Sequence, residues 1–145
     1  MQTMTADMVD HPPHYRTAAG IEAVDVIEAY GLARSWHLAS AMKYLLRAGR
    51  KGDWIEDLRK AGWYVRRWRT QIDGGMAWMP AMPDPRPRLP APADVVNAFG
   101  IHGAQRSAVY ALLGLAMVDG GHEAQAALAV VVQAQIDAAI EDAAA

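Results

Sequence analysis

Apolar residues recur at intervals of three and four along most of the chain, which is the spacing of amphipathic helices. In the segment 21–31, Ile21, Val24 and Ile27 fall on one side of such a helix, and acidic residues fall on another. Strands and helices do not alternate, so the pattern predicts an all-α fold, a small helical bundle. The predicted helices cover residues 21–31, 35–49, 53–72, 93–100, 104–118 and 122–143.

Two proline-containing segments without periodicity divide the chain. Residues 1–19 are predicted to form an extended N-terminal arm, and residues 79–92, with six prolines, a linker. The predicted organisation is an arm plus a charged helical hairpin over 1–78, the Pro-rich linker over 79–92, and an apolar packing or oligomerisation segment over 93–145. This last segment has too few charges for a solvated helix, so we expect it to be buried within a bundle or an oligomer.

The two halves of the chain show a weak internal similarity. DVIEAYGL (25–32) resembles DVVNAFGI (94–101), and AMKYLLRAGRKGD (41–53) resembles AVYALLGLAMVDG (108–120). Both halves then have the order short helix, helix, Gly-rich turn, helix. Helices rich in Ala, Val and Leu resemble one another easily, which favours chance over common ancestry. The interpretation as two degenerate helical-hairpin halves is kept as an alternative.

Charge is unevenly distributed. The net charge is −2, which argues against nucleic acid as a partner, but nine of the 14 basic residues lie between Lys43 and Arg69. The chain has no cysteine, its N-terminus lacks the features of a signal peptide, and its apolar stretches are too short to span a membrane. These features predict a cytoplasmic protein without a membrane partner.

The basic residues of the hairpin are candidates for holding phosphates. Lys43 and Arg47 are one helical turn apart, and Arg50 and Lys51 follow on the turn, so we expect Lys43, Arg47 and Arg50 to share a face. The next helix begins beside them, and its free N–H groups and dipole favour an anion. The Gly-x-x-x-x-Gly-Lys-[Ser/Thr] pattern of a P-loop is absent.

Acidic residues follow directly after these cations. Asp53 and Asp57 have the oxygen ligands that Mg²⁺ prefers and could place a magnesium ion beside the phosphates. The alternative interpretation is a solvated helical hairpin, in which Asp53 caps the third helix and Glu56 and Lys60 form an ordinary i, i+4 pair.

The arm and the third helix supply further candidates. His11, His14 and Tyr15 could fold over a base or a phosphate, although Tyr15 could equally pack the arm onto the body. Trp63 and Tyr64 lie among basic residues and could stack on a nucleobase, with core packing as the alternative.

Four ordered blocks within about residues 9–68 carry a resemblance to a known family: VDHPPHY, GIEAVDVIEAYGL, AMKYLLRAGRKGD and IEDLRKAGWYVRRW. They resemble a SaV-like family of small phage-encoded proteins of unknown function, some podovirus members of which are described as nucleotide kinases without a P-loop. The resemblance does not extend to residues 79–145. The matching positions are His11, Pro12, His14, Tyr15, Glu22, Lys43, Tyr44, Arg47, Gly49, Lys51, Asp57, Lys60, Trp63 and Tyr64.

The resemblance implies phosphorylation of a nucleoside monophosphate by a nucleoside triphosphate with Mg²⁺, in the host cytoplasm if the protein is phage-encoded. Lys43, Arg47, Lys51 and Asp57 would carry the catalysis, with Lys60 among the phosphate-binding residues. One departure is Ser40, which stands where the family pattern has Asn; if that Asn contacts the ligand, Ser40 replaces it only in part.

Two other hypotheses of function rest on the same residues. A non-catalytic module would bind and sequester a nucleotide, for example a signalling nucleotide of host defence. An all-α nucleoside triphosphate pyrophosphatase is less favoured, because the acids of the basic half are sparse and interleaved with cations. We also expect a homo-oligomer, in which the arm of one chain covers the hairpin of the next.

Overall fold

The computed structural model describes residues 17–73, 90–118 and 121–145, and these parts are helical, without a β-strand. The all-α prediction is therefore confirmed. The elements in chain order are α1 (Ala23–Ala29), the short 3₁₀ helix η2 (Leu32–Arg34), α2 (Trp36–Arg47), α3 (Trp54–Asp73), α4 (Pro92–Ala98), α5 (Gly103–Met117) and α6 (Gly121–Ala144). Within the described residues, no helix is both long and apolar enough to cross a membrane.

Side-chain caps fix the starts of the two helices of the charged hairpin. The Ser35 hydroxyl accepts a hydrogen bond from the Leu38 N–H at 3.2 Å at the start of α2. The Asp53 carboxylate accepts one from the Glu56 N–H at 3.0 Å at the start of α3, as the sequence predicts. Helix α2 ends at Arg47, two residues before the predicted end, so Gly49 and Arg50 belong to the turn.

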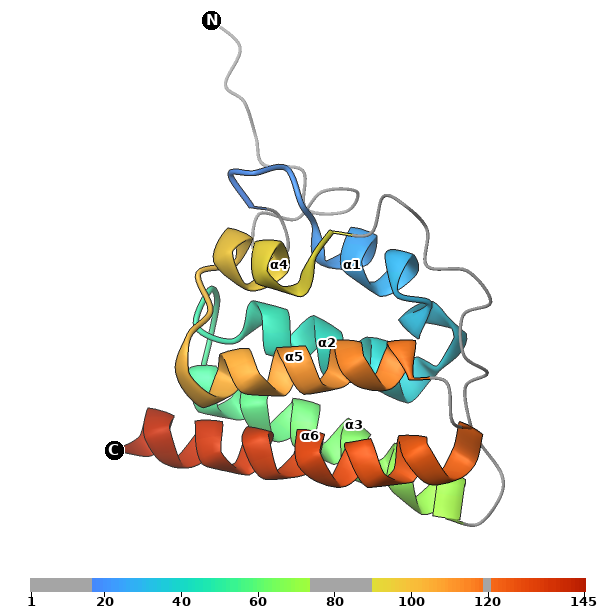
Figure 1. Ribbon diagram of the computed structural model, residues 1–145. Helices are drawn as coiled ribbons and strands as arrows, with labels where there is room; N and C mark the ends of the chain where they lie inside the picture. Colours follow the sequence, from blue (N-terminus) through green and yellow to red (C-terminus); the bar gives the residue numbers. More distant parts are fainter. Residues whose placement is uncertain (1–16, 74–89, 119–120) are drawn as a thin grey trace, which may run out of the picture.

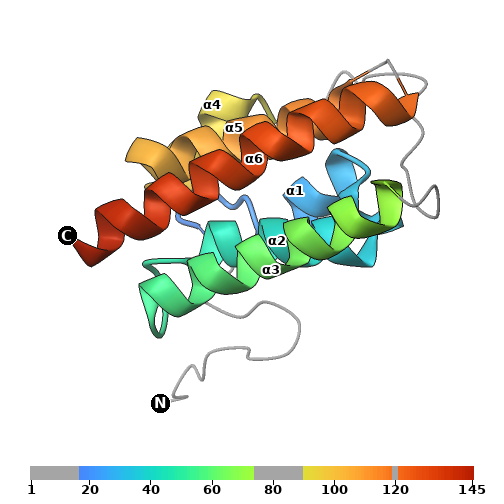
Figure 2. The same ribbon diagram turned by 90° about the horizontal axis from the view of Figure 1, so that it is seen from below.

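The helices form three layers (Figure 1). The short helices α1 and α4 lie on one side, α2 and α5 form the middle layer, and α3 and α6 form the opposite side. Figure 2 shows α3 and α6 running along each other on that side, and the contacts between α3 and α6 are among the most extensive between helices. Segments 17–73 and 90–145 thus pack on each other within one chain.

One hydrophobic core joins the two segments. Helix α6 contributes Ala129, Val132 and Ile136, which are fully buried, so the expected burial of the C-terminal segment occurs within the chain. Its outer side carries Val130 and Val131, which remain about half exposed (51% and 46%). The largest fully buried side chains come from both segments and include Leu38, Met42, Leu45, Leu58, Trp68, Ile72, Leu112, Leu113 and Ile136.

The two halves repeat the same order of elements. In each half a short helix ends at a buried aromatic residue, Tyr30 or Phe99. A glycine with positive φ follows, Gly31 at 71° and Gly100 at 66°, a backbone conformation that other residues rarely adopt. A pair of long helices comes next, α2 with α3 or α5 with α6. The structure thus contains the two helical-hairpin halves that the sequence similarity indicates.

Candidate functional site

Three cationic side chains converge on one tyrosine ring on the α2–α3 hairpin. The distances to the centre of the Tyr44 ring are 4.7 Å from Lys43 Nζ, 5.4 Å from Lys60 Nζ and 6.0 Å from Arg47 Cζ. Helix α2 supplies three of these residues and α3 supplies Lys60. We call Lys43, Tyr44, Arg47 and Lys60 the cation–tyrosine cluster. Cations at such distances are attracted by the electron-rich face of the ring.

A row of aromatic rings extends from this cluster along the hairpin. Tyr64 stacks on Tyr44, with ring centres 6.1 Å apart and planes at 11°, and Trp63 meets Tyr64 edge-on at 5.0 Å. His37 lies 6.1 Å from Tyr64 on the other helix. The His37 Nδ1 atom is buried and has no hydrogen-bond partner among the described residues. Trp63 is 52% exposed, so an aromatic surface faces solvent beside the cations.

A buried carboxylate, that of Asp57, pairs with one cation of the cluster. Asp57 Oδ2 lies 3.3 Å from Arg47 Nε, and the Asp57 side chain is 2% exposed. Burial raises the pKa of Asp57, and the nearby charges of Arg47 and Lys60 act in the opposite direction. The structure thus places Arg47 and Asp57, both predicted as catalytic, in an ion pair that ties the two helices together.

The two lysines of the cluster differ, because only one of them forms an ion pair among the described residues. Lys60 Nζ lies 2.9 Å from Glu56 Oε1 in an i, i+4 pair, and this hydrogen bond raises the pKa of Lys60. Among the described residues Lys43 has no ion pair, and its one charge contact is with the Tyr44 ring. Three cations against the carboxylates of Glu56 and Asp57 leave one positive charge, which is favourable for an anionic ligand.

Some predicted phosphate ligands lie elsewhere. Arg50 does not share a face with Lys43 and Arg47, because α2 has ended; its Cζ lies 5.3 Å from the Phe99 ring and its Nη1 donates to the Phe99 carbonyl at 3.5 Å. Lys51 is exposed on the turn, and Ser40 is buried in α2 at 6% exposure. His11, His14 and Tyr15 lie outside the described residues.

The carboxylates predicted to hold magnesium are both engaged by other groups. Asp53 caps α3, and Asp57 pairs with Arg47. In the parts of the chain that the structure describes, no three or more His, Cys, Asp or Glu residues come together as a metal site. The Mg²⁺ assignment, in which one or two carboxylates would act together with substrate phosphates, stays a prediction.

A buried glutamine that the sequence does not single out joins the two halves near this hairpin. Gln105 Nε2 donates to the carbonyls of Leu45 and Ala48 at 2.7 and 3.1 Å, and Gln105 Oε1 accepts from the Trp54 indole N–H at 3.0 Å. Gln105 thereby satisfies carbonyls at the end of α2 and fixes the ring at the start of α3. Its partners are 51 to 60 positions away, so no local sequence signal could reveal them.

Comparison with known proteins agrees with the coarser part of the resemblance. Residues 9–66 match the model of a family described as a protein of unknown function (DUF3310). The matched segment includes α1, α2 and most of α3, and with them the whole cation–tyrosine cluster, but it stops before α4. No curated protein and no solved structure matches the chain.

Proposed function

We propose that the cation–tyrosine cluster binds the phosphates of a nucleotide and that the protein is a nucleotide kinase. The observation that carries this proposal is the convergence of Lys43, Arg47 and Lys60 on Tyr44, with no carboxylate paired to Lys43 among the described residues. A phosphate at Lys43 would add a strong charge-assisted hydrogen bond without displacing an existing ion pair.

The aromatic row supports a nucleotide rather than a simple anion. Trp63 is half exposed, and the Tyr44–Tyr64 stack leads from it to the cations. A base stacked on Trp63 would leave its phosphates to extend toward Lys60 and Lys43. Such stacking suits any base, because every base has a flat π face.

The proposed reaction converts a nucleoside triphosphate and a nucleoside monophosphate into two diphosphates. The bond between the γ-phosphorus and its bridging oxygen breaks, and a phosphate oxygen of the acceptor forms the new bond to phosphorus. The cations of the cluster would offset the charge on the transferred group and hold both ligands in line. A magnesium ion would enter with the triphosphate, and no step relies on Asp53 or Asp57 as its ligands.

The test is a scan of the purified chain with nucleoside mono-, di- and triphosphates, with and without Mg²⁺, read by calorimetry and by chromatography of products. We expect conversion of a monophosphate to a diphosphate. Lys43→Ala should lower affinity about tenfold, the loss of one charge-assisted contact. The matched control is Arg106→Ala, which removes the cation from a similar cation–tyrosine contact with Tyr110 (5.4 Å) on α5. Equal effects of the two substitutions would contradict the proposal.

A nucleotide-sequestering module is the second candidate, and the pairing of Asp57 with Arg47 favours it. Phosphate binding needs only the cations, whereas turnover also needs groups or a metal that act on the reacting atoms. Binding that is lost in Lys43→Ala, with no product in any combination, would favour the module. Release of pyrophosphate from a triphosphate would instead indicate the pyrophosphatase.

The expected homo-oligomer is tested separately by mixing two impaired chains. One chain lacks residues 1–16 of the predicted arm, and the other carries Lys43→Ala. Recovery of activity in the mixture would support a site shared between chains, and no recovery would count against it.

A further inference from the structure

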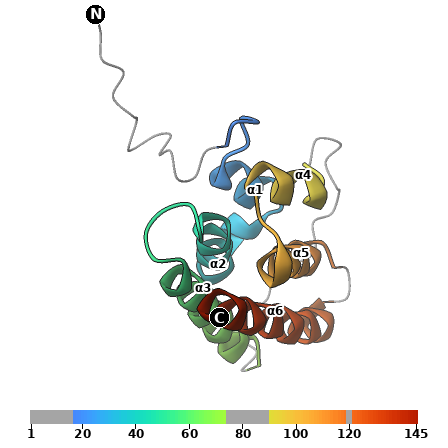
Figure 3. The same cartoon turned by 90° about the vertical axis from the view of Figure 1, so that its left-hand side faces the viewer.

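At the end of the bundle where α3 and α5 begin and α6 ends (Figure 3), the side chains leave a hollow that shares no lining residue with the cation–tyrosine cluster. One cavity of about 370 Å³ lies between Trp54, the first turn of α5 and the last turns of α6. A second, of about 240 Å³, lies between Arg50, Phe99 and Trp54. Trp54, His102 and Gln105 line both, so the two cavities adjoin. Their sizes suit a small organic ligand.

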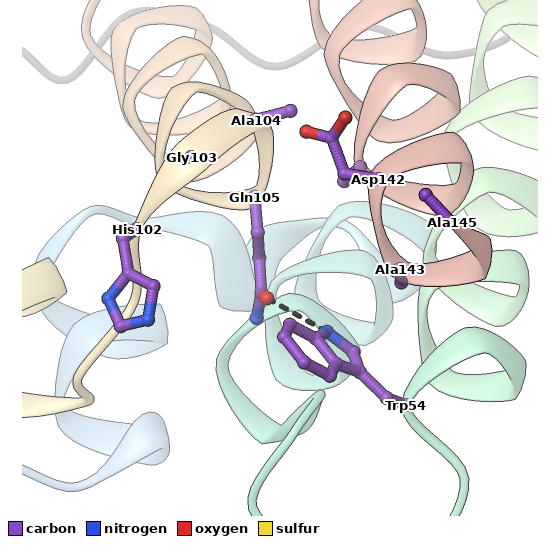
Figure 4. Close-up of a pocket in the computed structure, with 9 residues that line it drawn as sticks. Trp54, His102, Gly103, Ala104, Gln105, Asp142, Ala143 and Ala145 are labelled. Carbon is purple, nitrogen blue, oxygen red and sulfur yellow. Dashed lines mark hydrogen bonds between the residues drawn. The ribbon is translucent and has the colours of Figure 1, made fainter.

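The indole of Trp54 is both fixed and open to solvent. Its N–H is held by Gln105, which is itself anchored to the end of α2 (Figure 4). Gly49 lies against the ring, since a Cβ there would meet it at 3.5 Å. Nevertheless 44% of Trp54 remains exposed. A held aromatic ring with a free surface loses little entropy when a flat ligand stacks on it.

The two cavities differ in charge. Asp142 on α6 lines the larger cavity, and Figure 4 shows its carboxylate on the side of α6 that faces α5. Arg50 lines the smaller cavity, where its guanidinium lies against Phe99. Gly103 and Ala104 begin α5 there, and the side chain of His102, the residue before the helix, makes no capping hydrogen bond. A suitable ligand is therefore flat, carries N–H donors at one end and is anionic at the other.

We propose that this hollow is a second ligand site, which binds a nucleoside monophosphate with its base stacked on Trp54. The N–H groups of the base face Asp142, and the phosphate faces Arg50 and the start of α5. Residues from both halves of the chain build the site. It shares no residue with the cation–tyrosine cluster, and it does not depend on whether the protein transfers phosphoryl groups.

The experiment titrates the full chain with AMP, GMP, CMP and UMP, and with the matching nucleosides, by calorimetry and tryptophan fluorescence. We expect one or more monophosphates to bind, with Trp54→Leu weakening binding about tenfold. The control is Trp36→Leu, which removes another exposed indole (72%) and should leave affinity unchanged. Trp54→Phe, which keeps a ring, should bind more tightly than Trp54→Leu. Circular dichroism checks that each variant is folded.

Charge variants test the orientation of the ligand. Asp142→Asn should change the order of preference among the bases, whereas Glu141→Gln, its exposed neighbour on α6, should not. Arg50→Gln should remove most of the gain in affinity of a monophosphate over its nucleoside. Asp142 is exposed, so its substitution tests the site even if Trp54→Leu fails to fold.

The two nucleotide sites can be told apart by their variants. Monophosphate binding that survives Lys43→Ala and is lost in Trp54→Leu supports the second site. Binding that is lost in Lys43→Ala and survives in Trp54→Leu overturns it while leaving the proposed function intact. Absence of monophosphate binding in the wild-type chain also overturns it.

Discussion

Arg47 Nε lies 3.3 Å from Asp57 Oδ2, and this ion pair joins the last residue of α2 to the first turn of α3. The carboxylate is 2% exposed and the arginine 24%, so the pair is largely removed from solvent. Among the described residues, the cluster thus takes part in two ion pairs between a cation and a carboxylate. The pair of Arg47 with Asp57 is buried, and the pair of Lys60 with Glu56 lies on the surface. Breaking the buried pair should destabilise the hairpin, whereas the exposed pair contributes little to its stability.

Removing one partner of the buried pair should be costly. Arg47→Met leaves the Asp57 carboxylate buried without its cation, so we expect the free energy of unfolding to fall by about 3 kcal/mol. The double variant Arg47→Met with Asp57→Leu should recover most of this loss, because no charge then remains buried. Urea denaturation measures both, with exposed Arg59→Gln as the control. A double variant no more stable than Arg47→Met would contradict this account.

The ionisation of Asp57 should contribute to the pH dependence of the free energy of unfolding. Burial raises the pKa of this carboxyl in the folded protein, so the folded state binds the proton more tightly than the unfolded state. The stabilisation that the protonated Asp57 carboxyl gives the folded state is fully present below the pKa of this group in the unfolded chain. It is lost as pH rises through the pKa of the group in the folded protein. The unfolding free energy of the wild type minus that of Asp57→Asn should therefore decrease as pH rises from about 4, the ordinary pKa of an aspartate, through the raised folded pKa.

Urea denaturation of both proteins across this range measures the difference. Asp137→Asn, which changes an exposed carboxylate on α6, serves as the control. A difference that increases with pH would mean that the ion pair with Arg47 outweighs burial and lowers the pKa.

The sequence predicts the positions of the helices well because their period and caps are local. Asp53 begins α3 where its capping pattern places it, and the short helices end at the expected glycines. In α1, however, the buried side chains are Ala23 and Val26, and Val24 of the predicted apolar side is 47% exposed. It is harder to predict which face of the bundle a residue near a helix end will occupy. Ending α2 at Arg47 instead of Gly49 moves Arg50 away from Lys43 and onto Phe99 in the other half.

Contacts between helices depend on register, which one sequence does not reveal. Lys43, Tyr44 and Arg47 are neighbours on α2, but Lys60 reaches the same ring only through the packing of α3 on α2. Gln105 meets Trp54 and Leu45 only because the second half packs against the first. For this reason the cations are recognisable from the sequence, whereas Tyr44 as their centre and Gln105 as a link are not.

Gln105 should be a stabilising link between the halves. Gln105→Leu keeps the size of the side chain but leaves the carbonyls of Leu45 and Ala48 and the Trp54 N–H without this partner. We expect a loss of about 3 kcal/mol in unfolding free energy, because unsatisfied buried polar groups cost about 1–3 kcal/mol each. Gln135→Leu on α6 is the control, since Gln135 is partly exposed. Equal stability of the two variants would show that water replaces Gln105 at no cost.

Two helical glycines should respond in opposite directions to a larger side chain. A Cβ on Gly62 of α3 would lie 3.3 Å from Gln133 and 3.4 Å from Ile136 of α6, whereas a Cβ on Gly114 of α5 meets nothing within 4 Å. Gly62→Leu should force α3 and α6 apart and destabilise the protein by about 3 kcal/mol. Gly114→Ala should stabilise it by about 1 kcal/mol through helix propensity. Thermal unfolding measures both, and a neutral Gly62→Leu would mean that α3 and α6 are not tightly packed.

Tyr44 should matter for nucleotide binding beyond its part in the core. Tyr44→Leu removes the ring on which Lys43, Arg47 and Lys60 converge and on which Tyr64 stacks. Lys43 then loses its contact with the ring, and Arg47 and Lys60 keep their carboxylate partners but lose the ring, so we expect nucleotide affinity to fall about tenfold. Tyr110→Leu is the matched control, because among the described residues Tyr110 has a single cation, Arg106, over its ring on α5. Calorimetry with the nucleotide found in the scan measures both variants. If the two substitutions weaken binding equally, the effect is one of packing, and the convergence of cations on Tyr44 does not create the phosphate site.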